Sequence, residues 1–241
     1  MDRKAVLRSF LEEDAAERDI TSQTLLENKY VSARIEAREE MVLSGIEECI
    51  ELFGIAGVAA LPEKKDGDKA EPYEVILRLH GRVHSILSAE RSALNLLGRM
   101  SGIATAAYAA GNLAREINDH VRVAGTRKTA PGLRYFDKKA VAAGGGLPHR
   151  FDLEEAFLIK DTHRSFLAVD EAIRKCRAKF PKKIIDCEVE SVEDALRAAK
   201  AGADTIMFDN MSVEKIAEAI SALKAEGLRD KVMLEISDRK S

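Results

Sequence analysis

The sequence predicts an α/β protein in which a mixed α+β unit is followed by a parallel sheet or barrel. Two observations support this prediction. Up to about residue 90, helical spacing is mixed with short strand-like runs, whereas from Val121 onward short apolar runs alternate with helical patterns. The chain has 241 residues, of which 46% are hydrophobic and 33% charged, so it is long enough for one or two globular domains.

The composition argues against several classes of function. The net charge is −3 and aromatic residues make up 5% with no tryptophan, which disfavours a general nucleic-acid or membrane-surface binder. The three cysteines form no CxxC pair, so neither a disulfide framework nor a zinc site is expected. With no apolar leader and no run of ~18 apolar residues, we expect a cytoplasmic protein without nucleic-acid or membrane partners.

Three features define the first unit. Apolar residues within 46–53 recur at helical spacing and predict a helix. The polar segment 62–68 contains an Asp-Gly step and predicts a tight turn. The apolar runs 75–77 and 83–87, on either side of Gly81, predict two short strands.

A long helix and a series of strands are predicted next. The segment 88–117 has helical spacing with small residues on one face, which suits close packing in a linking or dimer-interface helix. Ser191 and Gly202 predict the N-cap and the C-terminal end of a later helix. Five apolar runs predict strands: 121–125, 156–159, 183–187, 204–208 and 231–234.

Charged residues follow each of these apolar runs. In a barrel, the carboxyl ends of parallel strands lie at one rim, where active sites are built. The charges are therefore predicted to converge on one mouth. In chain order they are Arg127 with Lys128, then Lys160, Glu188, Asp209 and Glu235.

These charges are separated by sign along the chain. The early ones, together with His149 and Arg150, are basic and suit carboxylates and phosphates. The late ones are acidic, and Glu188 with Asp209 offers oxygen ligands of the kind that suit Mg²⁺ better than zinc. For any one of these residues, an ordinary solvated strand end is an equal alternative.

Other residues near the predicted site are interpreted as structural. Arg134, Lys138 and Lys139 are expected on an exposed helix face, and His163 is expected to make a structural hydrogen bond. The glycine run 144–146 lets the backbone approach a ligand, although such a run also occurs at ordinary helix ends. No GxGxxG, Walker A or GxSxG motif is present.

Several stretches together resemble the quinolinate phosphoribosyltransferase family, also called carboxylating nicotinate-nucleotide pyrophosphorylases. The stretches TRKTAPGLR and GGGLPHR are the most specific, and all of them follow the family's order along nearly the whole chain. They are DITS (19–22), ERSALNLL (90–97), SGIAT (101–105), TRKTAPGLR (126–134), GGGLPHR (144–150), LIKD (158–161), Glu188 and FDNM (208–211).

The resemblance implies a fold and a reaction. The fold would be an N-terminal α+β sandwich with a linking helix over 1–104 and an incomplete, open parallel α/β barrel over 105–241, in a homodimer. The reaction would transfer phosphoribosyl from phosphoribosyl pyrophosphate to quinolinate with decarboxylation. It would use Mg²⁺ and give nicotinate mononucleotide, pyrophosphate and CO₂ for NAD biosynthesis.

The resemblance also implies roles for individual residues. Quinolinate would be held by Arg127, His149, Arg150 and Lys160, with Thr126 beside it. Arg91 would reach the site of the neighbouring subunit, and Lys128 would contact the diphosphate. Mg²⁺ and the ribose would be bound by Glu188 and Asp209. The residues that carry catalysis would be Lys128, Lys160, Glu188 and Asp209.

One departure from the family pattern leaves alternatives open. Where the family continues with glycine loops that hold the ribose 5-phosphate, this sequence reads Asp238-Arg239-Lys240-Ser241, and only five barrel strands are visible. Either the sequence is short of the natural chain or the site is completed in another way. Alternative functions are an impaired member that binds or assembles, the molybdenum-transport-associated relative, and a barrel aldolase with Lys160 as Schiff-base lysine.

Overall fold

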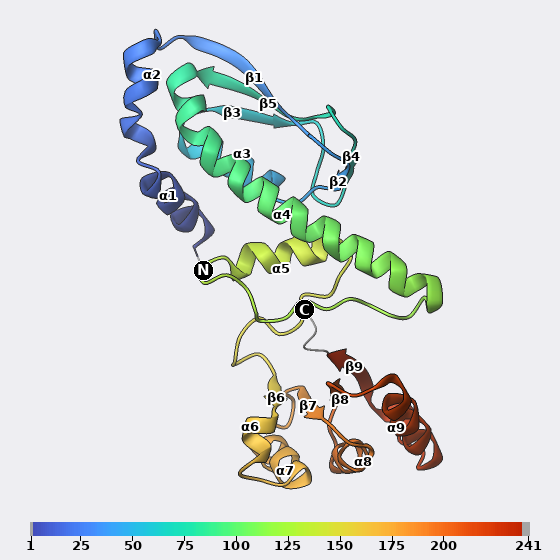
Figure 1. Cartoon of the computed structure of the whole chain (residues 1–241). Helices are drawn as coiled ribbons and strands as arrows, with labels where there is room; N and C mark the ends of the chain where they lie inside the picture. The colour runs from blue at the N-terminus through green and yellow to red at the C-terminus, as the bar shows by residue number, and fades with distance from the viewer. Residues whose placement is uncertain (1, 238–241) are drawn as a thin grey trace. The chain divides into compact units, whose positions relative to one another are not determined.

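The computed structural model describes residues 2–237 and divides into two compact units (Figure 1). The first unit extends to Phe151 and the second begins at Asp152. The predicted segment 238–241, with Asp238 at the expected phosphate loop, lies outside the described residues. The division into 1–104 and 105–241 stays a prediction, and the boundary between the compact units falls inside its second part.

The first unit combines an antiparallel sheet with helices. Strands β1, β5 and β3 form one sheet in that order, and β2 pairs with β4 in a second, two-stranded sheet. The elements are α1 (Arg3–Glu13), η1 (Ala16–Arg18), α2 (Ile20–Leu25), β1 (Tyr30–Glu36), β2 (Met41–Val42), α3 (Ile46–Ile55), β3 (Ala59–Pro62), β4 (Lys69–Ala70), β5 (Val75–Arg82), α4 (Val83–Ile117) and α5 (Arg134–Ala143).

Alternation along β5 explains which face of the sheet is buried. Leu77 and Leu79 are buried and Arg78 and His80 are exposed, as a period of two residues requires. The buried face joins a core shared with α1, α3, α4 and α5, in which Phe53 is fully buried. The helix predicted at 46–53 is confirmed as α3, and Gly67 has the positive φ of a turn.

One predicted strand of the first unit is wrong. The run 83–87 begins α4, which continues through the predicted helical stretch to Ile117. Gly81 does not separate two strands, because it lies inside β5 opposite Val58 of the packed core. A five-residue segment with apolar residues at 83, 86 and 87 fits a helix as well as a strand, and here the helical pattern that follows the segment also includes it.

The second unit is a parallel sheet with helices packed on one face. The strand order is β6-β7-β8-β9, with neighbouring strands parallel throughout. The elements are β6 (Phe157–Ile159), α6 (Asp161–Arg164), α7 (Val169–Lys179), β7 (Ile185–Val189), α8 (Val192–Ala201), β8 (Thr205–Asp209), α9 (Val213–Ala225), η2 (Arg229–Lys231) and β9 (Met233–Ser237).

Four of the five predicted barrel strands are present in the second unit. The fifth, 121–125, is wrong as a strand, since only Ala124 forms an isolated bridge, to Leu147. A strand needs pairing along its length, which the local apolar pattern does not report. Helix α8 is confirmed with its caps: the Ser191 hydroxyl accepts from the backbone N–H of Asp194, and Gly202 has φ of 92°. The α/β class, with an α+β part followed by a parallel α/β part, is confirmed.

Candidate active site

The strands of the second unit separate apolar from charged side chains. Successive residues of a strand point to opposite faces of its sheet. The face that packs against α7, α8 and α9 carries buried apolar residues such as Cys187, Ile206 and Phe208. The opposite face, which we call the charged sheet face, carries Lys160 directly after β6, Asp186 and Glu188 of β7, Asp209 of β8 and Glu235 of β9.

Lys160 and Glu188 form an ion pair on the charged sheet face. The Lys160 Nζ lies 3.5 Å from Glu188 Oε1, and the Glu188 side chain is largely buried. Burial raises the pKa of the Glu188 carboxyl, Lys160 lowers it, and the nearby Asp209 carboxylate raises it, with a net increase. The structure therefore brings Lys160, Glu188 and Asp209 together, as the strand-end charges predicted.

Helix α6 fixes the direction of Lys160 and the position of Glu188. The backbone N–H of Lys160 donates to His163 Nδ1 over 3.0 Å, which confirms the structural hydrogen bond predicted for His163. Arg164 donates to the backbone carbonyl of Glu188 over 3.2 Å and pairs with the Asp194 carboxylate. The lysine and its glutamate partner are thus held by adjacent side chains of one short helix.

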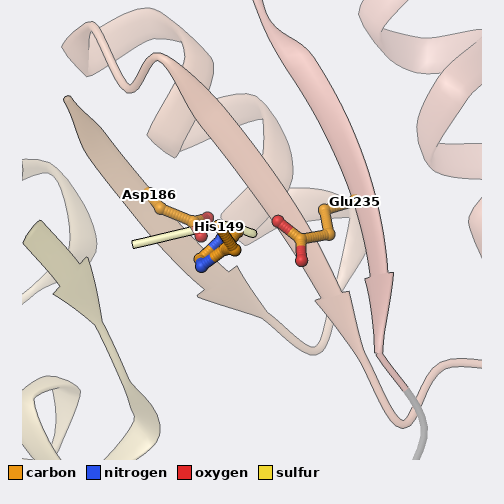
Figure 2. A group of neighbouring side chains, drawn as sticks. All are labelled: His149, Asp186 and Glu235. Atoms are coloured by element: carbon orange, nitrogen blue, oxygen red, sulfur yellow. The ribbon is translucent and has the colours of Figure 1, made fainter. Parts of the chain in front are cut away.

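Two carboxylates of this face were not among the predicted site residues. Asp186 is buried, and Glu235 is partly buried on the outer strand of the sheet. Figure 2 shows both side chains extending from the same side of the sheet. The sequence analysis placed Asp186 inside an apolar run and noted Glu235 only as a strand-end charge. The signal that could have found Asp186 was its spacing of two residues from Glu188 in one strand.

In the first unit, two segments with predicted substrate-binding residues are bonded to each other. The backbone N–H of Leu147 donates to Val123 O and that of Gly125 donates to Leu147 O, each over 2.8 Å. Gly144 permits this path: a Cβ there would lie 2.2 Å from the carbonyl oxygen of Ala104. The glycine run thus lets the chain turn back against α4.

The predicted substrate-binding residues lie on these two segments. Thr126 and Lys128 are exposed, and Arg127 is partly buried with its Nε lacking a hydrogen-bond partner among residues 2–237. Arg150 is buried, and His149 has the left-handed backbone conformation, with φ of 57°. The structure brings the segment of Arg127 beside the segment of His149 and Arg150, and the roles of these residues stay predictions.

The basic face predicted for α5 is only partly solvated, which corrects one prediction. Lys138 is 3% exposed, and its Nζ donates to backbone carbonyls of the two bonded segments. Lys139 binds Glu47, Glu48 and Asp66 at 2.8–3.0 Å, and Arg134 donates to Thr129 Oγ1 and Phe151 O. Carbonyls and carboxylates from distant parts of the chain replace the expected solvent.

Arg91 lies on the exposed side of α4. It lines a cavity of about 670 Å³ together with Asn95 and the segment 131–133, which follows the basic motif in the sequence. The predicted reach of Arg91 to a neighbouring subunit stays a prediction.

Within residues 2–237 we find no helix with the length and apolar character needed to cross a bilayer. The described cysteines, Cys49, Cys176 and Cys187, are free thiols. A parallel α/β unit with charged residues at the carboxyl ends of its strands is typical of an enzyme, because active sites of α/β proteins are built at those ends.

Comparison with known proteins assigns the family. The quinolinate phosphoribosyl transferase N-terminal domain matches residues 19–101, and the C-terminal domain of the same family matches residues 103–238. The chain therefore belongs to the quinolinate phosphoribosyl transferase family, and the resemblance inferred from the motifs is confirmed.

Individual relatives agree with the family match. The chain is 45% identical over 214 residues to a probable nicotinate-nucleotide pyrophosphorylase (carboxylating) of Archaeoglobus fulgidus, covering 89% of this chain and 83% of the relative. It is 41% identical to that of Methanothermobacter thermautotrophicus, covering 96% and 84%. The crystal structure of NadC from Streptococcus pyogenes matches with a TM-score of 0.88 at 36% identity, covering 98% and 82%.

Proposed function

We propose that this chain transfers the phosphoribosyl group of phosphoribosyl pyrophosphate to quinolinate and releases CO₂, giving nicotinate mononucleotide for NAD biosynthesis. The observation that carries the proposal is the family match across both parts of the chain, together with relatives that bear the carboxylating pyrophosphorylase name. The same observation favours this enzyme over an assembly protein, the molybdenum-transport-associated relative or an aldolase.

The free cysteines are compatible with a reducing cytoplasm.

Quinolinate carries two carboxylates, and this chain supplies basic groups to bind them. Arg127 offers a buried guanidinium N–H that has no partner among residues 2–237, and buried polar groups without partners are rare. We assign the carboxylates to Arg127, His149 and Arg150, with Lys160 as a further contact. Guanidinium groups bind carboxylates bidentately, which also orients the pyridine ring.

Two carboxylates of the charged sheet face fit a magnesium ion. Glu188 and Asp209 lie on neighbouring strands, and the raised pKa of Glu188 reflects the negative charge of Asp209 as well as burial. A cation would relieve this repulsion, and oxygen ligands suit Mg²⁺. When bound there, the ion would neutralise the diphosphate leaving group.

The reaction needs two bond changes that these residues can promote. The C1–oxygen bond to pyrophosphate breaks, with oxocarbenium character at C1, and the pyridine nitrogen forms the new bond to C1. The bond between ring carbon 2 and its carboxylate then breaks, CO₂ leaves, and the electron pair left on the ring takes up a proton. Lys128 would hold the diphosphate, and the basic residues would stabilise charge at the carboxylate during its loss.

A homodimer completes the proposal. Arg91 is exposed on α4 and lines a cavity, so its guanidinium is available to a neighbouring molecule. We propose that it enters the site of the partner subunit and contacts quinolinate there. Mixing two inactive variants, Arg91→Ala and Lys160→Ala, would then restore part of the activity through mixed dimers.

The proposed activity is tested by incubating the full chain with quinolinate, phosphoribosyl pyrophosphate and Mg²⁺. We expect nicotinate mononucleotide and CO₂ in equal amounts, measured by chromatography and by release of label from the 2-carboxylate. Nicotinate in place of quinolinate is the matched control, because it lacks the carboxylate that leaves. If neither product forms and quinolinate at millimolar concentration does not raise the unfolding temperature, the proposal is wrong.

A further inference from the structure

Lys138 is a buried cation that the proposed reaction does not use. It lies on α5, its side chain is almost fully enclosed, and the sequence predicted it to be exposed. A buried ammonium group is costly unless hydrogen-bond acceptors surround it. The position of those acceptors therefore indicates what the residue stabilises.

The acceptors of Lys138 belong to the two segments that carry the predicted quinolinate contacts. Its Nζ donates to Gly125 O at 3.4 Å, to Pro148 O, and to His149 O at 3.5 Å. Gly125 lies two residues before Arg127, and Pro148 lies two residues before Arg150. One ammonium group thus connects both segments directly behind the residues that would bind the substrate.

The backbone at His149 needs such support. Its φ of 57° is a conformation that residues with a side chain rarely adopt, so the surrounding contacts must hold it in place. The Leu147 hydrogen bonds to the other segment lie on the N-terminal side of this residue, and Lys138 binds the carbonyl of His149 itself. The lysine therefore stabilises the turn that directs His149 and Arg150.

Helix α5 is itself held at neighbouring positions. Asp137 accepts two hydrogen bonds from Arg99 of α4, at 2.7 and 2.8 Å, and Lys139 binds the carboxylates near α3. Three consecutive residues thus contact three different parts of the first unit, since successive side chains on a helix point about 100° apart. Lys138 is the member of this set that faces the substrate-binding segments.

We propose that Lys138 is a positioning residue for quinolinate, holding Arg127 on one segment and His149 and Arg150 on the other in the arrangement that binds the two carboxylates. This inference rests on the proposed function. It assigns no contact between Lys138 and the substrate. Because displacing a binding group by about 1 Å can cost about 10²-fold in rate, the effect of losing the lysine should be large.

The test compares Lys138→Met with Lys139→Met, the same substitution at the next residue of the helix. In Lys138→Met we expect the KM for quinolinate to rise at least about tenfold and the KM for phosphoribosyl pyrophosphate to stay within about threefold. In Lys139→Met, which removes the ion pairs with Glu47, Glu48 and Asp66, both values should stay within about threefold. Kinetics are measured at a temperature where both variants are folded by circular dichroism.

Each other outcome has a defined meaning. Unchanged quinolinate KM in Lys138→Met, or an equal rise in Lys139→Met, overturns the inference. If Lys138→Met does not fold, Lys138→Gln replaces it and is measured against the same limits, because its uncharged side-chain nitrogen lies one bond closer to the backbone and so further from the three carbonyls. Failure of the unsubstituted chain to bind or convert quinolinate would reject the proposed function instead, so the two failures are distinguishable.

Discussion

The two units of the molecule use charged residues in opposite ways. In the first unit, Lys139 lies among three carboxylates, and Lys138 among backbone carbonyls of the same unit. In the second unit, one sheet face carries Lys160 and four carboxylates, of which Glu188 has a raised pKa. Ion pairs and carbonyl contacts such as those of Lys138 and Lys139 stabilise a fold, whereas the raised pKa of Glu188 identifies a carboxylate whose ionised form its surroundings disfavour.

The largest effect should come from Lys160, the cation of the charged sheet face. We expect Lys160→Ala to lower kcat/KM by about 10³-fold or more, because it removes a charge from the proposed substrate site. Its free energy of unfolding should fall by less than that of Lys139→Met, since the Lys160 side chain is 44% exposed. Steady-state kinetics and thermal unfolding measure the two effects. The exposed Lys175 of the same unit is the control. Equal rates in Lys160→Ala and Lys175→Ala would show that Lys160 does not act in the substrate site.

At Lys139 we expect a large effect on stability and not on activity. Burial lowers the pKa of this lysine, but hydrogen bonds to Glu47, Glu48 and Asp66 outweigh it and raise the pKa. Lys139→Met leaves the fully buried Glu48 with only the longer contact to Arg3, at 3.5 Å, among residues 2–237, and should lower the free energy of unfolding by about 3 kcal/mol. Chemical denaturation measures this change.

The pH dependence of the Lys139 contribution has a defined sign. A lysine with a raised pKa contributes its full stabilisation below the unfolded-state value and loses it as pH rises through the folded-state value. The difference in free energy of unfolding between Lys139→Met and the unsubstituted chain should thus be constant near neutral pH. It should become smaller only in strongly alkaline solution. If the variant instead loses activity without losing stability, the contrast between the two units is wrong.

Glu188→Gln should separate stability from activity in the second unit. The pKa of Glu188 is raised in the folded state. Its ionised form therefore lowers the free energy of unfolding when the pH is above the folded-state pKa. This destabilisation is lost as the pH falls from the folded-state pKa to below the unfolded-state pKa. We expect the variant to unfold at a higher temperature at pH 7, by a few degrees, and to gain little near pH 4. Activity with Mg²⁺ should fall at least about 10²-fold.

The exposed Glu171→Gln is the control for this pH dependence, since Glu171 forms a surface ion pair with Lys175. Its unfolding temperature should follow that of the unsubstituted chain at every pH. A lower unfolding temperature for Glu188→Gln at pH 7 would mean that the ion pair with Lys160 outweighs burial.

The smallest effect tests a neutral contact in the second unit. Ser191→Ala removes the side-chain acceptor for the backbone N–H of Asp194 and should lower the free energy of unfolding by about 1 kcal/mol. Ser221, whose hydroxyl binds a carbonyl within α9, provides the control: Ser221→Ala should be neutral or slightly stabilising. Denaturant titration measures both, and the activity per folded molecule should be unchanged in each.

The fold could be predicted where local chemistry determines it. The caps of α8 and the alternation of apolar runs with helices are encoded within a few residues, and the structure confirms them. The segments 83–87 and 121–125 were wrong because pairing partners, which a local pattern does not contain, decide between strand and other structure. The motif residues were found through their resemblance to a family.

The buried charges were harder to predict than the strand-end charges. Lys138 and Lys139 were predicted to lie on a solvated helix face. The carbonyls and carboxylates that surround them are far away in the sequence and come close only after folding. Asp186 was hidden by its apolar neighbours, although its spacing from Glu188 places both on one face. Whether a charged side chain is buried depends on its neighbours in the folded protein. The spacing of residues along the sequence indicates only on which face of a helix or strand the side chain lies.

The left-handed backbone of His149 limits how this site can be changed in the laboratory or by evolution. Glycine, asparagine and aspartate adopt that conformation more easily than most residues, whereas valine, isoleucine and threonine resist it. A library that randomises position 149 to accept a different pyridine acid would therefore yield folded variants from a small subset of amino acids. Randomising position 127, a second proposed quinolinate contact whose φ is not positive, would be a more productive route to new specificity.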